Sequence, residues 1–564
     1  MSLTILYLVL RLPLNIPSAA ASVFAIPLYI SARSYVDLWT HDKAAKRLNA
    51  TIVPRVQGRW PGNIDIALRV AKSFKEEYVF QVFADLFREY GVTTLNMRLF
   101  WCDQMITMDE NVIKFVSSTG FLHFDKGIKW HERLDKILGT GLLNSDGDLW
   151  KTGRATARPF FARQRISDFA IFERTSTTTL DLITSRCRDG LPIDIQDLMS
   201  RFTLDSASEF LFGVKLDTLS LPLTVPGKVK LGPKGSLPID GITEFDEFIE
   251  ALEHVAVVTT QRSTQGEIWP LLELFKDRVE DSIPIIMNFM EPIVKRTMAE
   301  KQRRKDTGVE TVASENVFLD YLASKTDDVE HIRYELVNYL IASRDTTAAL
   351  LTFVVYFFSM HPAVCDRLRD EILAALGPEE CPTYDTLRSM KYLRSVLNEA
   401  LRLFPSLPSI ARTSLDTPLV IPASNQQAFY FPPQALVRTL PLLLHRRHDL
   451  WGDDADEFRP ERWLETATME KVQTTPFMYC PFWGGPRICI GQEFALNEAG
   501  FFIVKLLQRF KSFRFMPSFQ PVGSLPPKEW LGKAGRQGLE KIFPAVNMTL
   551  HSKGGLWVYG ALDE

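Results

Sequence analysis

One segment near the middle of the chain limits the fold more than any other. Residues 327–362, DDVEHIRYELVNYLIASRDTTAALLTFVVYFFSMHP, contain no glycine, and their only proline is the last residue. Apolar residues recur with helical spacing in the first half and fill almost every position from Ala348 to Met360. The segment therefore predicts one long helix that is polar where it begins and buried where it ends.

The rest of the chain predicts a mainly α protein with small β-sheets, folded as a single domain. Further helices are expected over residues 363–375, 384–404 and 490–510. Between the last two, prolines separate short apolar runs such as LVI and AFYF, which indicates short strands and turns. The tail GGLWVYG also reads as strand. Residues 219–237 have no regular pattern and are expected to form a surface loop.

The first 31 residues differ from the rest and predict a membrane anchor. No charged residue occurs from Leu12 to Ala32, and about 20 apolar residues suffice to cross a bilayer. A cleaved signal peptide is the competing interpretation, because PSAAAS offers small residues for cleavage. Positive residues follow from Arg33 to Arg47, which favours a cytosolic location for the globular part. We therefore expect an anchor over 1–31, a linker with a Pro/Gly hinge over 32–64 and a globular domain over 65–564.

Charge and cysteine usage exclude several classes of protein. The net charge of −3 gives no sign of a nucleic-acid-binding protein. The six cysteines are scattered through a long chain without CxxC pairs, which argues against a disulfide framework and a structural zinc site.

One cysteine has neighbours that suit a metal ligand. Cys489 lies in PFWGGPRICIGQEFAL, directly before a predicted helix whose first N–H groups and dipole favour a thiolate. Glycines there allow a large flat cofactor to approach the backbone, and Arg487 suits a carboxylate. Phe482 and Trp483 supply apolar cover. The segment indicates a thiolate bound to iron, and the alternative is an inert buried cysteine.

The same segment resembles a known family signature. FWGGPRICIG matches Phe-x-x-Gly-x-Arg-x-Cys-x-Gly at Phe482, Gly485, Arg487, Cys489 and Gly491. This is the haem-thiolate signature of the cytochrome P-450 superfamily. The resemblance implies a cytochrome P-450 fold that binds haem b (iron protoporphyrin IX). It makes Cys489 the axial iron ligand and places Phe482, Arg487 and Gly491 in the cofactor site.

Two further motifs occur in the order that the family has them. EALR and FRPERW contain Glu399, Arg402 and Arg462, which resemble the family's buried ion-pair triad near the proximal side of the haem. ASRDTT resembles the distal oxygen-activation motif, which makes Asp345 and Thr346 a proton relay. The alternative is that Thr346 only bonds back to the preceding turn. Ser343 stands where the family usually has glycine, so its hydroxyl is expected to narrow the oxygen groove or add a donor.

Two more matches concern the haem propionates. Trp150 and Arg154 resemble the family's Trp-x-x-x-Arg helix. Arg412, which follows the Glu-x-x-Arg helix, lies where the family often has another propionate partner.

The resemblance implies a haem-dependent monooxygenase that uses O₂. No GxGxxG motif is visible, so the electrons are expected from a separate NADPH-dependent cytochrome P-450 reductase. The motifs look most like fungal membrane-bound members that hydroxylate alkanes or fatty acids, with the endoplasmic reticulum as the expected location. Terpenoids, steroids and polycyclic aromatics remain alternative substrates. The rival functions are a haem-thiolate isomerase or dehydratase, a non-catalytic haem-binding protein, and a structural membrane protein without cofactor.

Overall fold

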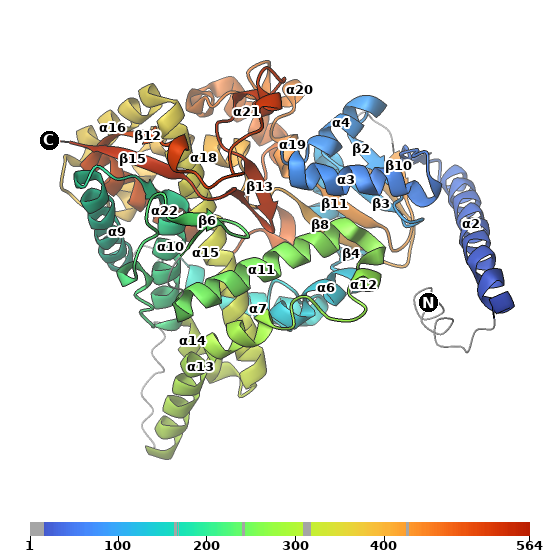
Figure 1. The fold of residues 1–564 in the computed structure, drawn as a ribbon, viewed down its shortest axis with the longest axis horizontal. Helices are drawn as coiled ribbons and strands as arrows, with labels where there is room; N and C mark the ends of the chain where they lie inside the picture. Colours follow the sequence, from blue (N-terminus) through green and yellow to red (C-terminus); the bar gives the residue numbers. More distant parts are fainter. Residues whose placement is uncertain are drawn as a thin grey trace.

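A computed structural model describes residues 16–162, 166, 169–239, 243–307, 317–424 and 428–563 of the chain. Helices make up most of it, and the sheets are small, so the predicted fold class is confirmed (Figure 1). The longer helices are α2 (Ile16–Arg47), α3 (Ile64–Glu76), α4 (Gln81–Tyr90), α6 (Ile128–Leu138), α7 (Gly147–Ala157), α9 (Ala170–Arg188), α10 (Ile195–Phe212), α11 (Glu244–Gln265), α13 (Ser282–Thr307), α14 (Phe318–Lys325), α15 (Val329–Met360), α16 (Pro362–Leu376), α18 (Lys391–Leu403), α21 (Thr466–Thr474) and α22 (Gln492–Arg509).

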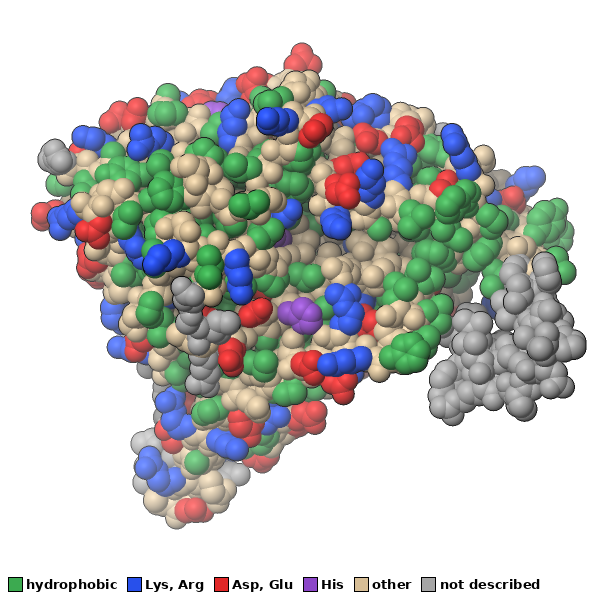
Figure 2. Space-filling view, viewed as in Figure 1, with side chains coloured by type: hydrophobic (Ala, Val, Ile, Leu, Met, Phe, Trp, Pro, Cys, Tyr) green, Lys and Arg blue, Asp and Glu red, His purple; other side chains and the backbone are tan. Residues whose placement is uncertain are grey.

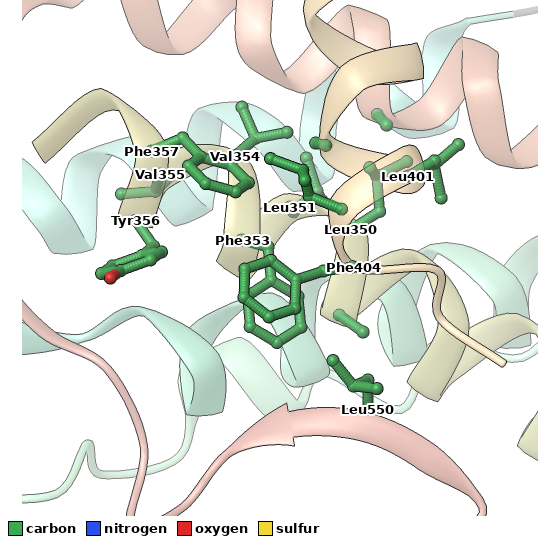
Figure 3. Packing of buried hydrophobic residues seen from close by; sticks show 14 of the residues in the cluster. Leu350, Leu351, Phe353, Val354, Val355, Tyr356, Phe357, Leu401, Phe404 and Leu550 are labelled. Carbon is green, nitrogen blue, oxygen red and sulfur yellow. The ribbon is translucent and has the colours of Figure 1, made fainter. Parts of the chain in front are cut away.

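Helix α15 is the predicted central helix, and its bounds agree with the sequence pattern. Its second half is buried on all sides, and it packs against α10, α18 and α22. Phe353 of α15 stacks on Phe404, with the ring centroids 4.3 Å apart (Figure 3). Burial of such aromatic side chains is a main source of folding free energy, so α15 organises the core on which the site is built.

The strands form small sheets, as expected from the proline-rich second half. The largest has the order β2-β3-β11-β8-β4, and a second has the order β1-β10-β9. The others are β12-β15-β5 and the hairpins β13-β14 and β6-β7. Their bounds are β1 (Thr51–Ile52), β2 (Thr94–Asn96), β3 (Gln104–Thr107), β4 (Phe124–Asp125), β5 (Ile193–Asp194), β6 (Val229–Leu231), β7 (Ser236–Pro238), β8 (Ile410–Ser414), β9 (Leu419–Pro422), β10 (Ala428–Phe431), β11 (Leu436–Thr439), β12 (Phe510–Phe515), β13 (Pro544–Asn547), β14 (Thr549–Ser552) and β15 (Trp557–Leu562).

Two local predictions need correction. The helix expected over 384–404 is divided into α17 (Tyr384–Ser389) and α18, because Met390 is extended (ψ 93°) and its side chain is buried. The region 219–237 is not only a loop, since residues 229–238 form the β6–β7 hairpin. Lys234, in the turn of this hairpin, is buried.

The N-terminal part differs from the predicted boundaries. Residues 1–15 of the expected anchor lie outside the described residues. Helix α2 then runs through position 32 without a break, so the first part of the expected linker is helical. Arg98 donates to the Ser34 hydroxyl over 2.9 Å, and β1 pairs with β10, so the 32–64 segment is attached to the domain near its start and again at Thr51–Ile52. Side-chain contacts of this kind leave no trace in a local sequence pattern.

Among the described residues, one helix is long and apolar enough to cross a membrane, and this is α15. Most of α15 is enclosed by the protein, as expected of a core helix.

Candidate active site

A cavity of about 440 Å³ lies in the middle of the domain. Helix α15 and α11 line it together with parts of α6, α7, β8, β11 and the segment around Cys489. Most of its lining side chains are apolar. Nine of the predicted site residues line this one cavity: Trp150, Arg154, Asp345, Thr346, Arg412, Phe482, Arg487, Cys489 and Gly491. Glu399, Arg402 and Arg462 do not line it.

The cysteine loop holds Cys489 at the wall of the cavity. Its N–H donates to the carbonyl of Phe482 over 3.0 Å, and Gly491 is the N-cap residue of α22. Cys489 is exposed to the cavity, yet desolvation by the surrounding protein raises the pKa of its thiol, although the N–H of Gly491 and the nearby Arg154 lower it. The protein alone therefore favours the neutral thiol, and a bound metal cation is needed to hold the thiolate.

The two glycines of the signature serve different purposes. Gly485 has a φ of +66°, and a Cβ atom there would lie 2.0 Å from the carbonyl oxygen of Ser117. Glycine is therefore required here for close contact with the π-helical segment Phe115–Thr119. Gly491 lines the cavity, and a Cβ there would meet only Phe161, at 3.6 Å.

Cationic side chains gather along one edge of the cavity. Arg487 pairs with Asp146 over 2.6 Å and stacks on the Trp150 ring at 4.4 Å. Arg154 donates to the carbonyl of Ile488 over 2.7 Å. Burial and the neighbouring Arg487 lower the pKa of Arg412 to about 9, and its Nη1 has no hydrogen-bond partner among the described residues.

Lys126 belongs to the same edge, and the sequence analysis missed it. Burial, then Arg412 and Arg487, lower the pKa of its ammonium well below the usual value. The Lys126 Nζ lies 4.3 Å from the centroid of the Trp130 ring. No local motif marks Lys126, and only its burial in the folded chain distinguishes it from a surface lysine.

The residues present fit iron protoporphyrin IX. Burying cations without enough carboxylates nearby costs folding free energy. Anionic groups such as the two haem propionates would therefore stabilise Lys126, Arg412 and Arg487. The apolar walls suit a porphyrin face, and the Cys489 sulfur supplies a soft ligand for iron. The cofactor prediction therefore agrees with the chemistry of this cavity.

The triad lies behind the cysteine loop. Glu399 accepts hydrogen bonds from Arg402 (2.8 and 2.9 Å) and from Nε of Arg462 (2.9 Å), and all three side chains are buried. Arg402 also donates to the carbonyl of His445 over 2.7 Å. The His445 ring accepts the N–H of Cys480 over 3.0 Å, so the triad is linked to the start of the loop that carries Cys489.

The Asp345 carboxylate is held in an ion-pair network. Its oxygens lie 2.9 Å from Arg344 and 3.3 Å from Lys234, which reaches it from the β6–β7 hairpin. Burial raises its pKa, but Lys234 and Arg344 outweigh that effect and lower it below the usual value. Asp345 is thus ionised near neutral pH. The contribution of Lys234 was not visible in the sequence, where its segment looked like a loop.

The hydroxyl groups next to Asp345 bond to their own helix. Thr346 Oγ1 donates to the carbonyl of Ala342 over 2.6 Å, which is the back-bonded arrangement considered as the alternative. Its oxygen still has a lone pair free to accept a hydrogen bond from the cavity. Ser343 likewise donates to the carbonyl of Tyr339 over 2.7 Å, so in this geometry it adds no donor to the cavity.

These features define the class of the protein. The domain is mainly helical, and its buried cavity has cationic side chains along one edge and a cysteine sulfur directly before a helix. A protein with these features is a haem-thiolate protein. Comparison with known proteins agrees, since residues 62–527 match the family model for cytochrome P-450. The chain belongs to the cytochrome P-450 family.

Its relatives include fungal and yeast enzymes. Cytochrome P-450 monooxygenase g430 of a Fusarium species is 31% identical over 88% of this chain and 85% of its own. Cytochrome P-450 52E1 of Candida apicola is 33% identical, with 77% and 80% covered. Cytochrome P-450 52A6 of Candida tropicalis is also 33% identical, with 75% and 78% covered.

Family membership decides between the functions that the sequence left open. The chain is a haem-dependent monooxygenase. It uses O₂, receives electrons from a reductase and acts on an apolar organic substrate. A haem-thiolate isomerase or dehydratase is not favoured, because Asp345 and Thr346 are both at the cavity and relatives are named monooxygenases.

Proposed function

We propose that this monooxygenase hydroxylates a long-chain fatty acid or alkane held between α11 and α15. The observation that carries the proposal is that one apolar cavity is lined by Cys489, by Thr346 and by a continuous set of hydrocarbon side chains. When bound, haem with its thiolate ligand supplies the activation of O₂ and the insertion of one oxygen atom. The protein orients the substrate, excludes water and delivers protons.

Helix α11 provides much of the substrate-facing wall. Leu252, Val255 and Ala256 line the cavity. The aromatic residues of the same helix do not, since Phe248 is fully buried and stacks on Phe289 with the ring centroids 3.9 Å apart. The α11 part of the wall is therefore aliphatic, while aromatic side chains such as Phe74, Phe80 and Phe210 line other parts of the cavity, and together they form an apolar surface that suits a hydrocarbon chain.

Asp345 and Thr346 are the proposed proton relay. The ionised Asp345 carboxylate can take a proton from solvent when its contact with Lys234 opens. Thr346 can accept a hydrogen bond on its cavity side while it donates to Ala342. The proposed relay pairs a carboxylate with a hydroxyl, and both residues line the cavity.

The direct test uses the purified holoprotein with NADPH and a fungal cytochrome P-450 reductase. Dodecane and dodecanoic acid are supplied, and the products are analysed by mass spectrometry for one added oxygen atom. Hydroxylated product that depends on NADPH, reductase and O₂ is expected. Turnover of steroids or polycyclic aromatics alone, with neither linear substrate oxidised, would reject the substrate class.

Thr346→Ala is expected to separate NADPH consumption from product formation. Loss of the hydroxyl weakens proton delivery, so product formed per NADPH should fall roughly tenfold or more, with peroxide released instead. The measurement compares NADPH, peroxide and product in the same reaction. Thr352→Ala is a matched control, because Thr352 lies on the same helix, makes the same bond to the preceding turn (2.7 Å) and does not line the cavity. Unchanged coupling in Thr346→Ala would remove this residue from the relay.

We further propose that the protein is bound to the membrane of the endoplasmic reticulum through residues 1–31, with the domain on the cytosolic side. The exposed apolar residues Tyr35, Val36, Trp39, Trp60 and Leu68 lie on or near α2 and α3. Figure 2 shows apolar side chains gathered at the end of the molecule that carries these helices. This surface can rest on the bilayer next to an anchor.

Deletion of residues 1–31 is expected to release the protein from membranes while haem stays bound. The deletion leaves Ser34 and its contact with Arg98 in place, so the domain should fold. Sedimentation of the membrane fraction and the haem absorption spectrum check this result. If the shortened protein still pellets with membranes, the anchor lies elsewhere, for example on the exposed apolar surface near α3.

A further inference from the structure

Two arginines line the cavity apart from the cofactor edge. Arg133 belongs to α6 and Arg438 to β11, and both contribute to the cavity wall together with Ser263 of α11. Arg438 donates to the Ser263 hydroxyl over 2.7 Å. Arg133 is nine-tenths buried and donates to the carbonyl of Gly266 over 3.4 Å.

Neither arginine has an acidic partner in an ion pair within the described residues. Nε of Arg133 has no hydrogen-bond partner there. Glu267, the acid that acts most strongly on the pKa of Arg133, is already paired with Lys129 over 2.7 Å. Burial lowers the pKa of Arg133, and burial together with Arg133 lowers the pKa of Arg438 to about 10. Two desolvated like charges side by side cost free energy unless an anion joins them.

Arg438 and Arg412 both line the cavity, but they extend from opposite faces of the sheet. In the β11–β8 ladder Arg438 is opposite Ala411, whereas Arg412 is opposite Val437. Successive residues of a strand face opposite sides, so Arg438 and Arg412 point to opposite faces of the sheet. The charges that shift the pKa of Arg412 are Arg487, Asp146 and Asp125. None of these three shifts the pKa of Arg438, on which Arg133 acts instead. The propionates therefore do not account for Arg133 and Arg438.

We propose that Arg133 and Arg438 form an anion subsite that binds the carboxylate of a long-chain acid, with the hydrocarbon chain in the apolar part of the cavity. This inference rests on the proposed function and narrows it from hydrocarbons in general to acids. Guanidinium groups suit a carboxylate because each presents paired N–H donors. The Ser263 hydroxyl, which accepts from Arg438, orients that guanidinium.

The test measures binding, not turnover, with two ligands of equal chain length. Dodecanoate and dodecan-1-ol are titrated into the holoprotein, and Kd is read from the haem absorption shift and from the rise in Tm. The wild-type protein is expected to bind dodecanoate more tightly. In Arg438→Gln and Arg133→Gln the Kd for dodecanoate should rise roughly 10-fold to 100-fold, as for loss of a charged hydrogen bond, while the Kd for the alcohol stays unchanged.

Two further variants keep the test decisive. Arg438→Lys retains the charge without the paired donors, and dodecanoate affinity should fall between wild type and Arg438→Gln. Arg88→Gln is a matched surface control, since the Arg88 side chain is 72% exposed and pairs with Asp85. If Arg133→Gln does not fold, Arg438→Gln alone decides the question.

Equal losses for acid and alcohol, or no loss for the acid, would overturn the subsite. The result is independent of the reaction. A protein that binds dodecanoate through Arg438 but oxidises neither dodecane nor dodecanoic acid refutes the proposed function and keeps the subsite. A protein that oxidises both substrates, and whose Kd for dodecanoate is the same in wild type and Arg438→Gln, refutes the subsite and keeps the proposed function.

Discussion

Cys489→Ser is expected to abolish both the thiolate-type carbon monoxide spectrum and substrate oxidation. A serine hydroxyl does not ionise near neutral pH, so the iron of bound haem would lose the electron-rich ligand that favours O–O cleavage. No measurable turnover should remain. The measurement is the carbon monoxide difference spectrum of the reduced protein, followed by product analysis with reductase and NADPH.

Cys480→Ala is the matched control for this change. Cys480 lies in the same segment, but its thiol is buried among apolar side chains and does not line the cavity. Burial raises the pKa of this thiol to about 12, so it stays protonated. The Cys480→Ala protein should keep the thiolate-type spectrum. Retention of that spectrum in Cys489→Ser, or its loss only in Cys480→Ala, would show that residue 489 is not the iron ligand.

Glu399→Gln is expected to cost about 3–5 kcal/mol of folding free energy, because it leaves two buried guanidinium groups without their shared anion. Domains are stable by only about 5–15 kcal/mol, so the variant should keep a much smaller free energy of unfolding and purify with less haem. Glu399 also accepts the Nε1–H of Trp463 and the N–H of Arg459, over 2.9 and 3.0 Å, and these bonds weaken too. Haem content after purification and the urea midpoint measure the effect.

The same site predicts a dependence of stability on pH. Burial raises the pKa of Glu399, but Arg402 and Arg462 outweigh it and lower the pKa below the usual value. A lowered carboxyl pKa stabilises the fold fully above the unfolded pKa of about 4.3, and this contribution is lost as the pH falls further. Glu399→Gln should therefore reduce the loss of stability on acidification below that value.

Glu461→Gln tests whether any nearby carboxylate would have the same effect. Glu461 lies in the same PERW element but is 36% exposed, and its partner Arg367 is 52% exposed. An exposed ion pair of this kind contributes about 0–1 kcal/mol to the free energy of unfolding. Haem content should stay near the wild-type level. A loss equal to that of Glu399→Gln would mean that the whole element, and not the buried triad, is required.

The sequence predicted much of the fold because its strongest signals are local. The bounds of α15 and α22 follow from uninterrupted helical periodicity, and prolines mark the strands between α18 and β11. The prediction merged α17 and α18 into one helix, because the buried Met390 between them fits the periodic pattern although its backbone is extended. The contact of Ser34 with Arg98, 64 positions further along the chain, is likewise not visible in a local pattern.

The motifs also indicated Cys489 and eight other residues that line the cavity, because they combine rare residue types at short spacing. They did not indicate Lys126, Lys234, Arg133 or Arg438. Each of these is an ordinary cation in the sequence, and only burial beside a carboxylate or another cation distinguishes it. Burial depends on packing between distant segments, which a local pattern does not encode.

By itself the sequence determined the class of chemistry, since a cysteine placed before a helix and followed by glycine is a property of neighbouring residues. The tertiary structure alone decided which charges meet. Arg412 on β8, Arg487 in the cysteine loop and Lys126 before α6 share one desolvated edge, whereas Arg438 faces the other side of its sheet. Electrostatic interaction acts through space, so its partners are known only when the chain has folded.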